Sequence, residues 1–212
     1  MNSIEGILIE PVGCLAEFPS GPFHEIAAHI FGKKGKASPS GSRSYWHLLN
    51  LLDAAKTPAD MRILEAAEIE AVESARLYED VRPVLAELGK MSIHVAVATS
   101  LSCAATRRFL EVNSLAELFS GVWCRDNAGG IKAALLVRAM QGAGLQADHT
   151  IYLTDTVEGI NVARSARVHP ILMMNDPDEA RRLAMHNPAG GVVSFHEIPD
   201  FIRLIAAQNP SV

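Results

Sequence analysis

The stretch Ile7-Leu8-Ile9-Glu10-Pro11-Val12-Gly13-Cys14-Leu15 decides the fold. An apolar run leads into a loop that contains a glycine, and one carboxylate, Glu10, stands at the turn. An α/β enzyme presents a nucleophile or a metal ligand in this way, at the carboxyl end of a buried parallel strand. We therefore expect a strand over residues 4–9 and a candidate site directly after it.

The composition is that of a folded chain with little affinity for polyanions. The 212 residues are 49% hydrophobic and 20% charged, which is enough for one α/β core and an inserted subdomain. The formal charge of −5 disfavours nucleic acid and anionic membranes as partners. No apolar run approaches the roughly 18 residues of a spanning helix, and no basic segment precedes the first apolar run. We expect a soluble cytoplasmic protein.

The cysteines support the same compartment. Cys14, Cys103 and Cys124 are odd in number and widely spaced, and they form no CxxC motif. We therefore expect three free thiols in a reducing cytosol. Cys14 has no histidine or cation near it in the sequence, which favours a buried filler over a nucleophile.

Strand and helix patterns alternate through the second part of the chain. Apolar strand patterns cover residues 93–98, 121–124, 150–153 and 170–174. Helical patterns cover residues 102–112, 132–142, 159–166, 178–185 and 198–208. A further helix is expected through Val84 and Leu88, with Asp80 as its cap and Gly89 near its end. This alternation predicts right-handed βαβ units and a doubly wound parallel sheet.

Residues 16–79 interrupt that alternation. Helical periodicity runs through Phe23–Phe31, Tyr45–Ala54 and Ala59–Tyr78, with a Gly/Ser/Lys loop between the first two. We expect a core domain of residues 1–15 and 80–212 and a helical cap domain of residues 16–79 over the edge of the sheet that carries the site.

These segments resemble, in order, the motifs of the haloacid dehalogenase-like (HAD) hydrolase superfamily, in its helical-cap (C1) subgroup. Glu10-Pro11-Val12-Gly13-Cys14 stands where the family has Asp-x-Asp-Gly-Thr, so the first motif is degenerate. Val95-Ala96-Val97-Ala98-Thr99-Ser100 matches the second motif and Gly130-Ile131-Lys132 the third. Thr154-Asp155-Thr156-Val157-Glu158-Gly159 stands where the family has Gly-Asp-Ser-x-x-Asp. Leu77–Leu85 resembles the family's re-entry from cap to core.

The resemblance implies a Rossmann-like core and roles for particular residues. Glu10 takes the place of the catalytic nucleophile, and Thr99 or Ser100 would donate to a phosphate oxygen. Lys132 would neutralise charge on the phosphate and the nucleophile together. The expected Mg²⁺ ligands are Glu10, the Val12 carbonyl, Asp155 and Glu158. The expected ligand contacts are Ser100 and Gly13 in the core and Lys33 and Arg43 in the cap loop.

Each of these residues also has an ordinary structural interpretation. Glu10 could hydrogen-bond the turn that follows it, and Asp155 could cap the next helix. Thr99 and Ser100 could be simple strand-end caps, and Lys132 an exposed residue of a first helical turn. The loop Lys33–Arg43 could be a solvated connection.

Three positions depart from the family pattern and bear on catalysis. Glu10 is one methylene longer than Asp, which moves its oxygens by roughly 1.5 Å, and misplacements of about 1 Å can cost ~10²-fold in rate. Val12 cannot act as a general acid, a loss of about 10²–10⁴-fold. Gly159 removes a second acid from the metal shell. Family branches that cleave carbon–halogen or carbon–phosphorus bonds also lack the acid at Val12.

The sequence thus leaves two functions open. The first is a HAD-like protein with weak or no phosphatase activity, which binds a small anionic ligand or a partner. The second is a Mg²⁺-dependent hydrolase of a small phosphorylated metabolite, with Mg²⁺ supplying the charge that Val12 cannot.

Overall fold

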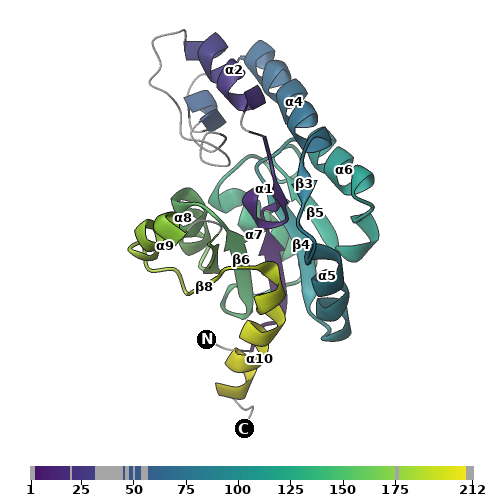
Figure 1. Cartoon of the computed structure of the whole chain (residues 1–212), viewed down its shortest axis with the longest axis vertical. Helices are drawn as coiled ribbons and strands as arrows, with labels where there is room; N and C mark the ends of the chain where they lie inside the picture. Colours follow the sequence, from purple (N-terminus) through teal and green to yellow (C-terminus); the bar gives the residue numbers. More distant parts are fainter. Residues whose placement is uncertain are drawn as a thin grey trace.

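A six-stranded parallel sheet forms the centre of the molecule (Figure 1). The computed structural model describes residues 3–19, 21–31, 45, 48–49, 51–53, 57–174 and 177–208. The strand order is β5-β4-β1-β6-β7-β8. The strands are β1 (Gly6–Ile9), β4 (His94–Thr99), β5 (Gly121–Cys124), β6 (Thr150–Thr154), β7 (His169–Met173) and β8 (Gly190–Val192). This confirms the predicted doubly wound sheet.

The position of β1 explains why the predicted site residues gather. Strand β1 lies between β4 and β6, with Ile9 in register with Val97 on one side and with Leu153 on the other. All four β1 residues are buried. The carboxyl ends of these three parallel strands therefore meet at one edge of the sheet.

Helices cover both faces of the sheet, which makes three layers. Ile7 and Ile9 belong to the apolar cluster that contains residues of α5 (Val81–Lys90), α6 (Cys103–Val112) and α10 (Ile198–Gln208). Leu8 belongs to the cluster on the other face, with residues of α7 (Ala133–Ala143) and α8 (Val157–Ser165). Helix α9 (Pro177–Ala184) lies between β7 and β8 in the chain. The alternation along β1 is the two-residue period of a strand covered on both sides.

A helical insert leaves and re-enters the core through a short antiparallel ribbon. Strand β2 (Ala16–Glu17) pairs with β3 (Arg76–Leu77). Between them lie α2 (Gly21–Phe31) and α4 (Pro58–Glu73), and the described residues from 45 to 53 are helical. Figure 1 shows α2 and α4 beyond the end of the sheet at which β1 leads into α1 (Pro11–Cys14), while both termini lie at the opposite end. The division into domains at residues 15 and 80 stays a prediction.

Two local expectations at the start of α5 and in the insert are wrong. Helix α4 ends at Glu73, and β3 occupies residues expected to be helical. Asp80 takes the N-cap position of α5 without making a side-chain cap bond. Its carboxylate instead accepts hydrogen bonds from Ser194 Oγ and from His196 N, the latter at 3.0 Å. Asp80 therefore ties α5 to the segment before α10.

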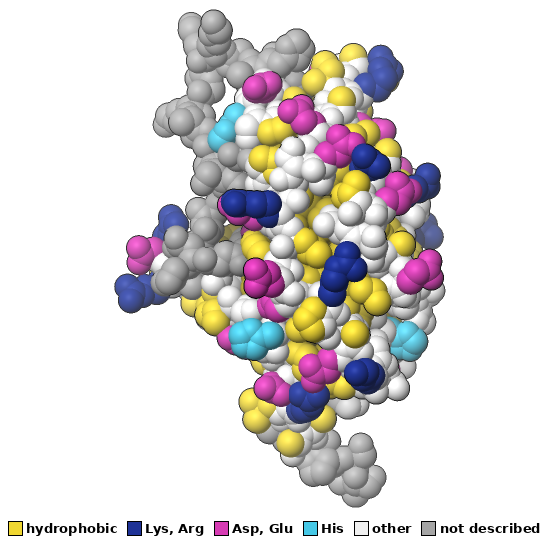
Figure 2. All heavy atoms as spheres, turned by 45° about the vertical axis from the view of Figure 1, so that its right-hand side comes forward, with side chains coloured by type: hydrophobic (Ala, Val, Ile, Leu, Met, Phe, Trp, Pro, Cys, Tyr) yellow, Lys and Arg dark blue, Asp and Glu magenta, His cyan; other side chains and the backbone are white. Residues whose placement is uncertain are grey.

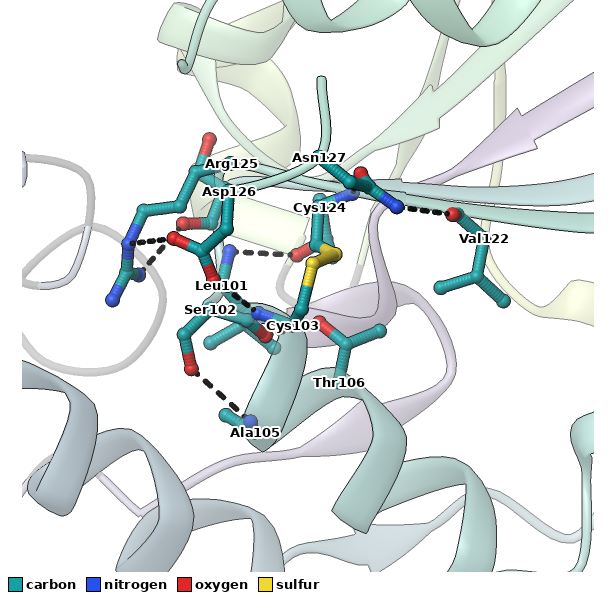
Figure 3. Close-up of a disulfide and its surroundings, with 12 residues drawn as sticks. Leu101, Ser102, Cys103, Ala105, Thr106, Val122, Cys124, Arg125, Asp126 and Asn127 are labelled. Atoms are coloured by element: carbon teal, nitrogen blue, oxygen red, sulfur yellow. Dashed lines mark hydrogen bonds and ion pairs between the residues drawn. A yellow bond between two sulfur atoms is a disulfide. The ribbon is translucent and has the colours of Figure 1, made fainter. Parts of the chain in front are cut away.

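The expectation of three free thiols is also wrong. Cys103, the first residue of α6, and Cys124, the last residue of β5, form a disulfide (Figure 3). Their Cα atoms lie 5.3 Å apart, within the usual range for a disulfide. Cys14 is free and buried, as expected of a filler. The argument from free thiols for a reducing compartment therefore fails for this pair.

Within the described part of the chain, every helix is too short or too polar to cross a lipid bilayer.

Candidate active site

Glu10 lies at the centre of the site, directly after β1, and its side chain is buried. Its Oε1 atom accepts a hydrogen bond of 2.6 Å from Thr99 Oγ1 and a long one of 3.5 Å from Val12 N. Its Oε2 atom accepts from Ser100 N at 3.3 Å. The first and second predicted motifs thus meet as expected, with both oxygens of Glu10 facing donors from the ends of β1 and β4.

Burial dominates the electrostatics of Glu10. It raises the pKa of the carboxyl to about 8, against the lowering effect of the hydrogen bonds from Thr99, Ser100 and Val12. The nearby negative charge of Asp155 raises this pKa further. Among the described residues, no lysine or arginine forms an ion pair with Glu10. Burial thus favours the protonated form of this carboxyl, and a protonated carboxyl is a poor nucleophile.

Asp155 packs against the turn that follows Glu10. Gly13 has φ +77°, and a Cβ atom at this residue would come within 1.9 Å of Asp155 Oδ2. A glycine is thus required here both by the backbone conformation and by the close approach of the carboxylate. Thr156, not Asp155, caps α8, because its Oγ1 accepts from Gly159 N at 3.0 Å. The interpretation of Asp155 as a helix cap is therefore wrong.

Gly159 has no room for the acid that the family has at this position. A Cβ atom there would lie 1.9 Å from Thr154 Oγ1 and 2.7 Å from Thr154 Cβ. Thr154 stands where the motif that this segment resembles begins with a glycine, and its side chain fills the space beside Gly159. Glu158 lies partly buried in the first turn of α8, and its role as a metal ligand stays a prediction.

Lys132 faces the helical insert. It takes the N-cap position of α7 with φ 68°, so the helix begins one residue later than expected. Its Nζ atom lies 3.2 Å from Asp53 Oδ2, and both side chains are about half exposed. The structure therefore gives the lysine a carboxylate partner in the insert, and its expected contact with a phosphate stays a prediction. Lys33 and Arg43 lie outside the described residues.

A buried ion pair that the sequence did not predict joins the insert to the core. Glu68 of α4 is fully buried, accepts from Tyr45 Oη at 2.8 Å and from Ser102 N at 3.0 Å, and pairs with Arg125 Nη1. Arg125 Nη1 also donates to Ser100 O at 3.0 Å. Burial raises the pKa of Glu68, and the charge of Arg125 and its hydrogen bond oppose that rise. The arrangement fixes α4 on the loop that carries the second motif.

The sequence carried one signal for this pair. Glu68 stands among the buried residues of α4, which are otherwise apolar: Leu64, Ala67, Ala71 and Val72. A charge on an apolar face requires a buried partner. No sequence pattern identified Arg125 as that partner.

A cavity of about 300 Å³ lies beside Arg125, between the insert and the core. Its walls are mostly apolar and come from Leu49, Leu52, Asp53, Thr57, Pro58 and Met61 of the insert and from Arg125, Asp126, Gly130 and Ile131 of the core. The cavity thus adjoins the third motif, at Gly130 and Ile131.

The donors near Glu10 fit Mg²⁺ in kind. Glu10 and Asp155 supply hard carboxylate oxygens, and their mutual repulsion is of the sort that a cation relieves. Ser100 Oγ is buried without a hydrogen-bond partner in the described part of the chain. No group of three or more His, Cys, Asp or Glu side chains that could hold a metal occurs among the residues that the structure describes.

Comparisons with known proteins agree with the fold. Residues 37–173 match the family model described as haloacid dehalogenase-like hydrolase. A haloacid dehalogenase-like hydrolase from Streptococcus pneumoniae is similar in structure, with a TM-score of 0.72, 17% identity and coverage of 95% of this chain and 99% of that one. A "predicted phosphatase" from Clostridium acetobutylicum has a TM-score of 0.73, 14% identity and coverage of 95% and 99%.

A third similar structure belongs to an enzyme of different chemistry. The L-2-haloacid dehalogenase from Xanthobacter autotrophicus has a TM-score of 0.64, 13% identity and coverage of 94% of this chain and 98% of that one. At these identities the three structures show a shared fold alone. A comparison with curated protein sequences finds no match.

Proposed function

This chain belongs to the haloacid dehalogenase-like hydrolase family, and from this membership we propose a member in which phosphomonoester hydrolysis is slow or lost. We propose further that its site binds a small anionic ligand or a partner. The observation that carries the proposal is the set of hydrogen bonds on Glu10.

Those hydrogen bonds come from groups that a phosphoryl substrate would need. The Thr99 hydroxyl and the Ser100 N–H point at Glu10 at 2.6 and 3.3 Å. The longer side chain of glutamate carries its oxygens to these donors, so a substrate oxygen would have to displace the protein's own carboxyl. Displacement would leave a buried carboxyl with fewer hydrogen bonds, which is costly.

Two further positions support slow or absent hydrolysis. Val12 is buried and carries no proton to transfer to a leaving group. Gly159 offers no carboxylate to the metal shell, and Thr154 fills the adjacent space. Each of these changes removes a separate contribution to the rate of phosphomonoester hydrolysis. The hydrogen bonds that hold Glu10 lower the same rate.

If the site takes Mg²⁺, Asp155, Glu10 and the Val12 carbonyl would hold it. The bound ion would supply positive charge beside Glu10 and the anionic ligand. Glu10 would then keep its position through Thr99 and Ser100, while Gly13 leaves room for the Asp155 carboxylate.

The charge distribution supports a small ligand over a polyanion. On the face shown in Figure 2, acidic and basic side chains are interspersed and no continuous basic area is visible. The net charge of −5 points the same way.

A Mg²⁺-dependent hydrolase of a small phosphorylated metabolite is the second candidate. It is favoured by the carboxylate of Asp155 beside the Gly13 turn and by the buried Ser100 hydroxyl, which could donate to a ligand. In this case Mg²⁺ would have to lower the pKa of Glu10 for the carboxylate to act as a nucleophile.

Hydrolysis of a panel of phosphomonoesters with Mg²⁺ separates the two candidates. Asp155→Asn serves as the blank, and Asp178→Asn, which changes an exposed aspartate, is the matched control. We expect the unaltered protein to be no faster than the blank. Turnover far above the blank, retained in Asp178→Asn and lost without Mg²⁺, would establish the hydrolase instead. Titration with inorganic phosphate then measures whether the site binds an anion.

A further inference from the structure

The Ser102 N–H and the Arg125 guanidinium, which together bind the Glu68 carboxylate, are called here the Glu68 clamp. The clamp and the disulfide lie on the same two segments of the core. Ser102, which donates its N–H to Glu68, directly precedes Cys103. Arg125, which forms the ion pair with Glu68, directly follows Cys124. Figure 3 shows the disulfide beside both residues. The two core groups that hold the buried carboxylate of the insert are thus each attached to one half of the disulfide.

Backbone contacts reinforce this unit. Arg125 N donates to Leu101 O at 3.2 Å, and Cys103 N donates to Asp126 Oδ2 at 2.7 Å. The loop after β4 and the loop after β5 therefore form one cross-linked platform under α4. The N–H of Ser102 and the guanidinium of Arg125 can both bind Glu68 only while these two loops keep their spacing.

The clamp depends on accurate spacing because Glu68 is fully buried. A buried carboxylate is tolerated only while its charge is paired and its oxygens are hydrogen-bonded. If the two loops separate slightly, one donor is lost, and α4 is then held on the core less firmly.

We propose that Cys103 and Cys124 are a reversible thiol–disulfide pair whose oxidised form fixes the Ser102 and Arg125 donors on Glu68, so that the redox state sets how firmly the helical insert is held on the core. Reduction frees the two loops and lets α4 open more often. This inference concerns the contact between insert and core, and it does not depend on whether the site hydrolyses a phosphoester.

The two sulfurs differ in a way that suits thiol–disulfide exchange. Cys103 is partly exposed at the start of helix α6, whereas Cys124 is buried, so a thiol or disulfide in solution reaches Cys103 first. With a low-molecular-weight disulfide RSSR as oxidant, the Cys103 thiolate attacks one sulfur, the RS–SR bond breaks, and RS⁻ leaves and takes a proton. The Cys124 thiolate then attacks Cys103 Sγ and expels the second RS⁻. Overall, two protein thiols are oxidised and RSSR is reduced to two RSH.

Two measurements on the chain of 212 residues test the proposal. The first is alkylation of thiols in denaturant with mass spectrometry, after incubation with glutathione disulfide or with dithiothreitol. The second is hydrogen–deuterium exchange of the α4 amides under the same two conditions. The Cys103→Ser/Cys124→Ser double variant is the control for effects of the reagents themselves.

We expect one free thiol per chain, Cys14, after oxidation and three after reduction. We also expect about tenfold faster exchange in α4 of the reduced protein, because exchange reports local opening. The double variant should show fast exchange under both conditions. Three titratable thiols after oxidation would overturn the pairing. A disulfide that forms without any change in the exchange of α4 would overturn its link to the clamp.

Discussion

The side chain of Thr154 occupies the space that a side chain at residue 159 would need. A Cβ atom on Gly159 would lie 1.9 Å from Thr154 Oγ1. Because real Cβ atoms do not approach other atoms so closely, the identities of these two residues are coupled across the first turn of α8. A side chain at residue 159 therefore requires the Thr154 side chain to move or to be smaller.

This coupling predicts a non-additive pair of substitutions. Gly159→Asp alone should destabilise the fold by about 1–3 kcal/mol, the usual cost of overpacking a buried site. Thr154→Gly should relieve part of that cost when it is combined with Gly159→Asp, although it removes packing when made alone. Urea unfolding of the two single variants and the double variant gives the coupling energy. Additive effects would show that the two side chains do not compete for the same space.

The raised pKa of Glu10 predicts that the stability of the fold depends on pH. Its pKa is raised from 4.5 to about 8 in the folded protein, so between these values the folded state binds more protons than the unfolded state. Its contribution to stability is full below about pH 4.5 and is lost as the pH rises toward 8, a decline on the order of a few kcal/mol. Urea unfolding between pH 5 and pH 8 should show this decline, and Glu10→Gln should flatten it.

Glu70→Gln, a change at an exposed glutamate, is the matched control for that series. It should leave the pH dependence as it is in the unaltered protein. Equal slopes in Glu10→Gln and Glu70→Gln would mean that Glu10 titrates near its ordinary value.

Removal of one partner from the Glu68–Arg125 pair should cost more than removal of both. Arg125→Met leaves a buried carboxylate without its cation, which we expect to cost about 3–5 kcal/mol. Glu68→Leu/Arg125→Met replaces both charges with apolar groups and should recover much of that loss. Equilibrium unfolding in urea compares the variants. A double variant that loses the sum of the single effects would contradict this account of the pair.

Lys132 should matter little to stability. Its ion pair with Asp53 is half exposed on both sides, and such pairs contribute about 0–1 kcal/mol. Lys132→Gln and Asp53→Asn should therefore each lower the unfolding free energy by less than about 1 kcal/mol, and added salt should shrink the difference. If Lys132→Gln instead abolishes phosphate binding while Asp53→Asn keeps it, the lysine acts on the ligand as the third motif implies.

The sequence predicts the centre of the site better than its surroundings. Glu10, Thr99 and Ser100 follow strands with strong apolar patterns, and parallel strands bring their carboxyl ends to one edge. The apolar patterns predict the strands, and the resemblance to the family implies that these three residues lie together at the site. The raised pKa of Glu10 was not predictable, because it depends on how completely the side chain is buried.

Contacts between separate segments account for what the sequence could not predict. The paired strands β2 and β3 have two residues each, too few for a periodic signal. The pairing of Cys103 with Cys124 follows from the distance between α6 and β5 in space, which spacing along the chain does not encode. The partners of Lys132 and Glu68 depend in the same way on how the insert packs on the core.

The β2–β3 ribbon has a consequence for how this chain tolerates change in length. Ala16 lies opposite Leu77, and Tyr78 N donates to Leu15 O at 3.0 Å, so the two ends of the insertion are direct neighbours. A tight turn after Glu17 could join them, and the ribbon would then be an ordinary hairpin. The chain could thus run from β1 to α5 through this hairpin, without the helices of the insert. Insertions and deletions between the two strands can alter what covers the site while leaving the order of the sheet untouched.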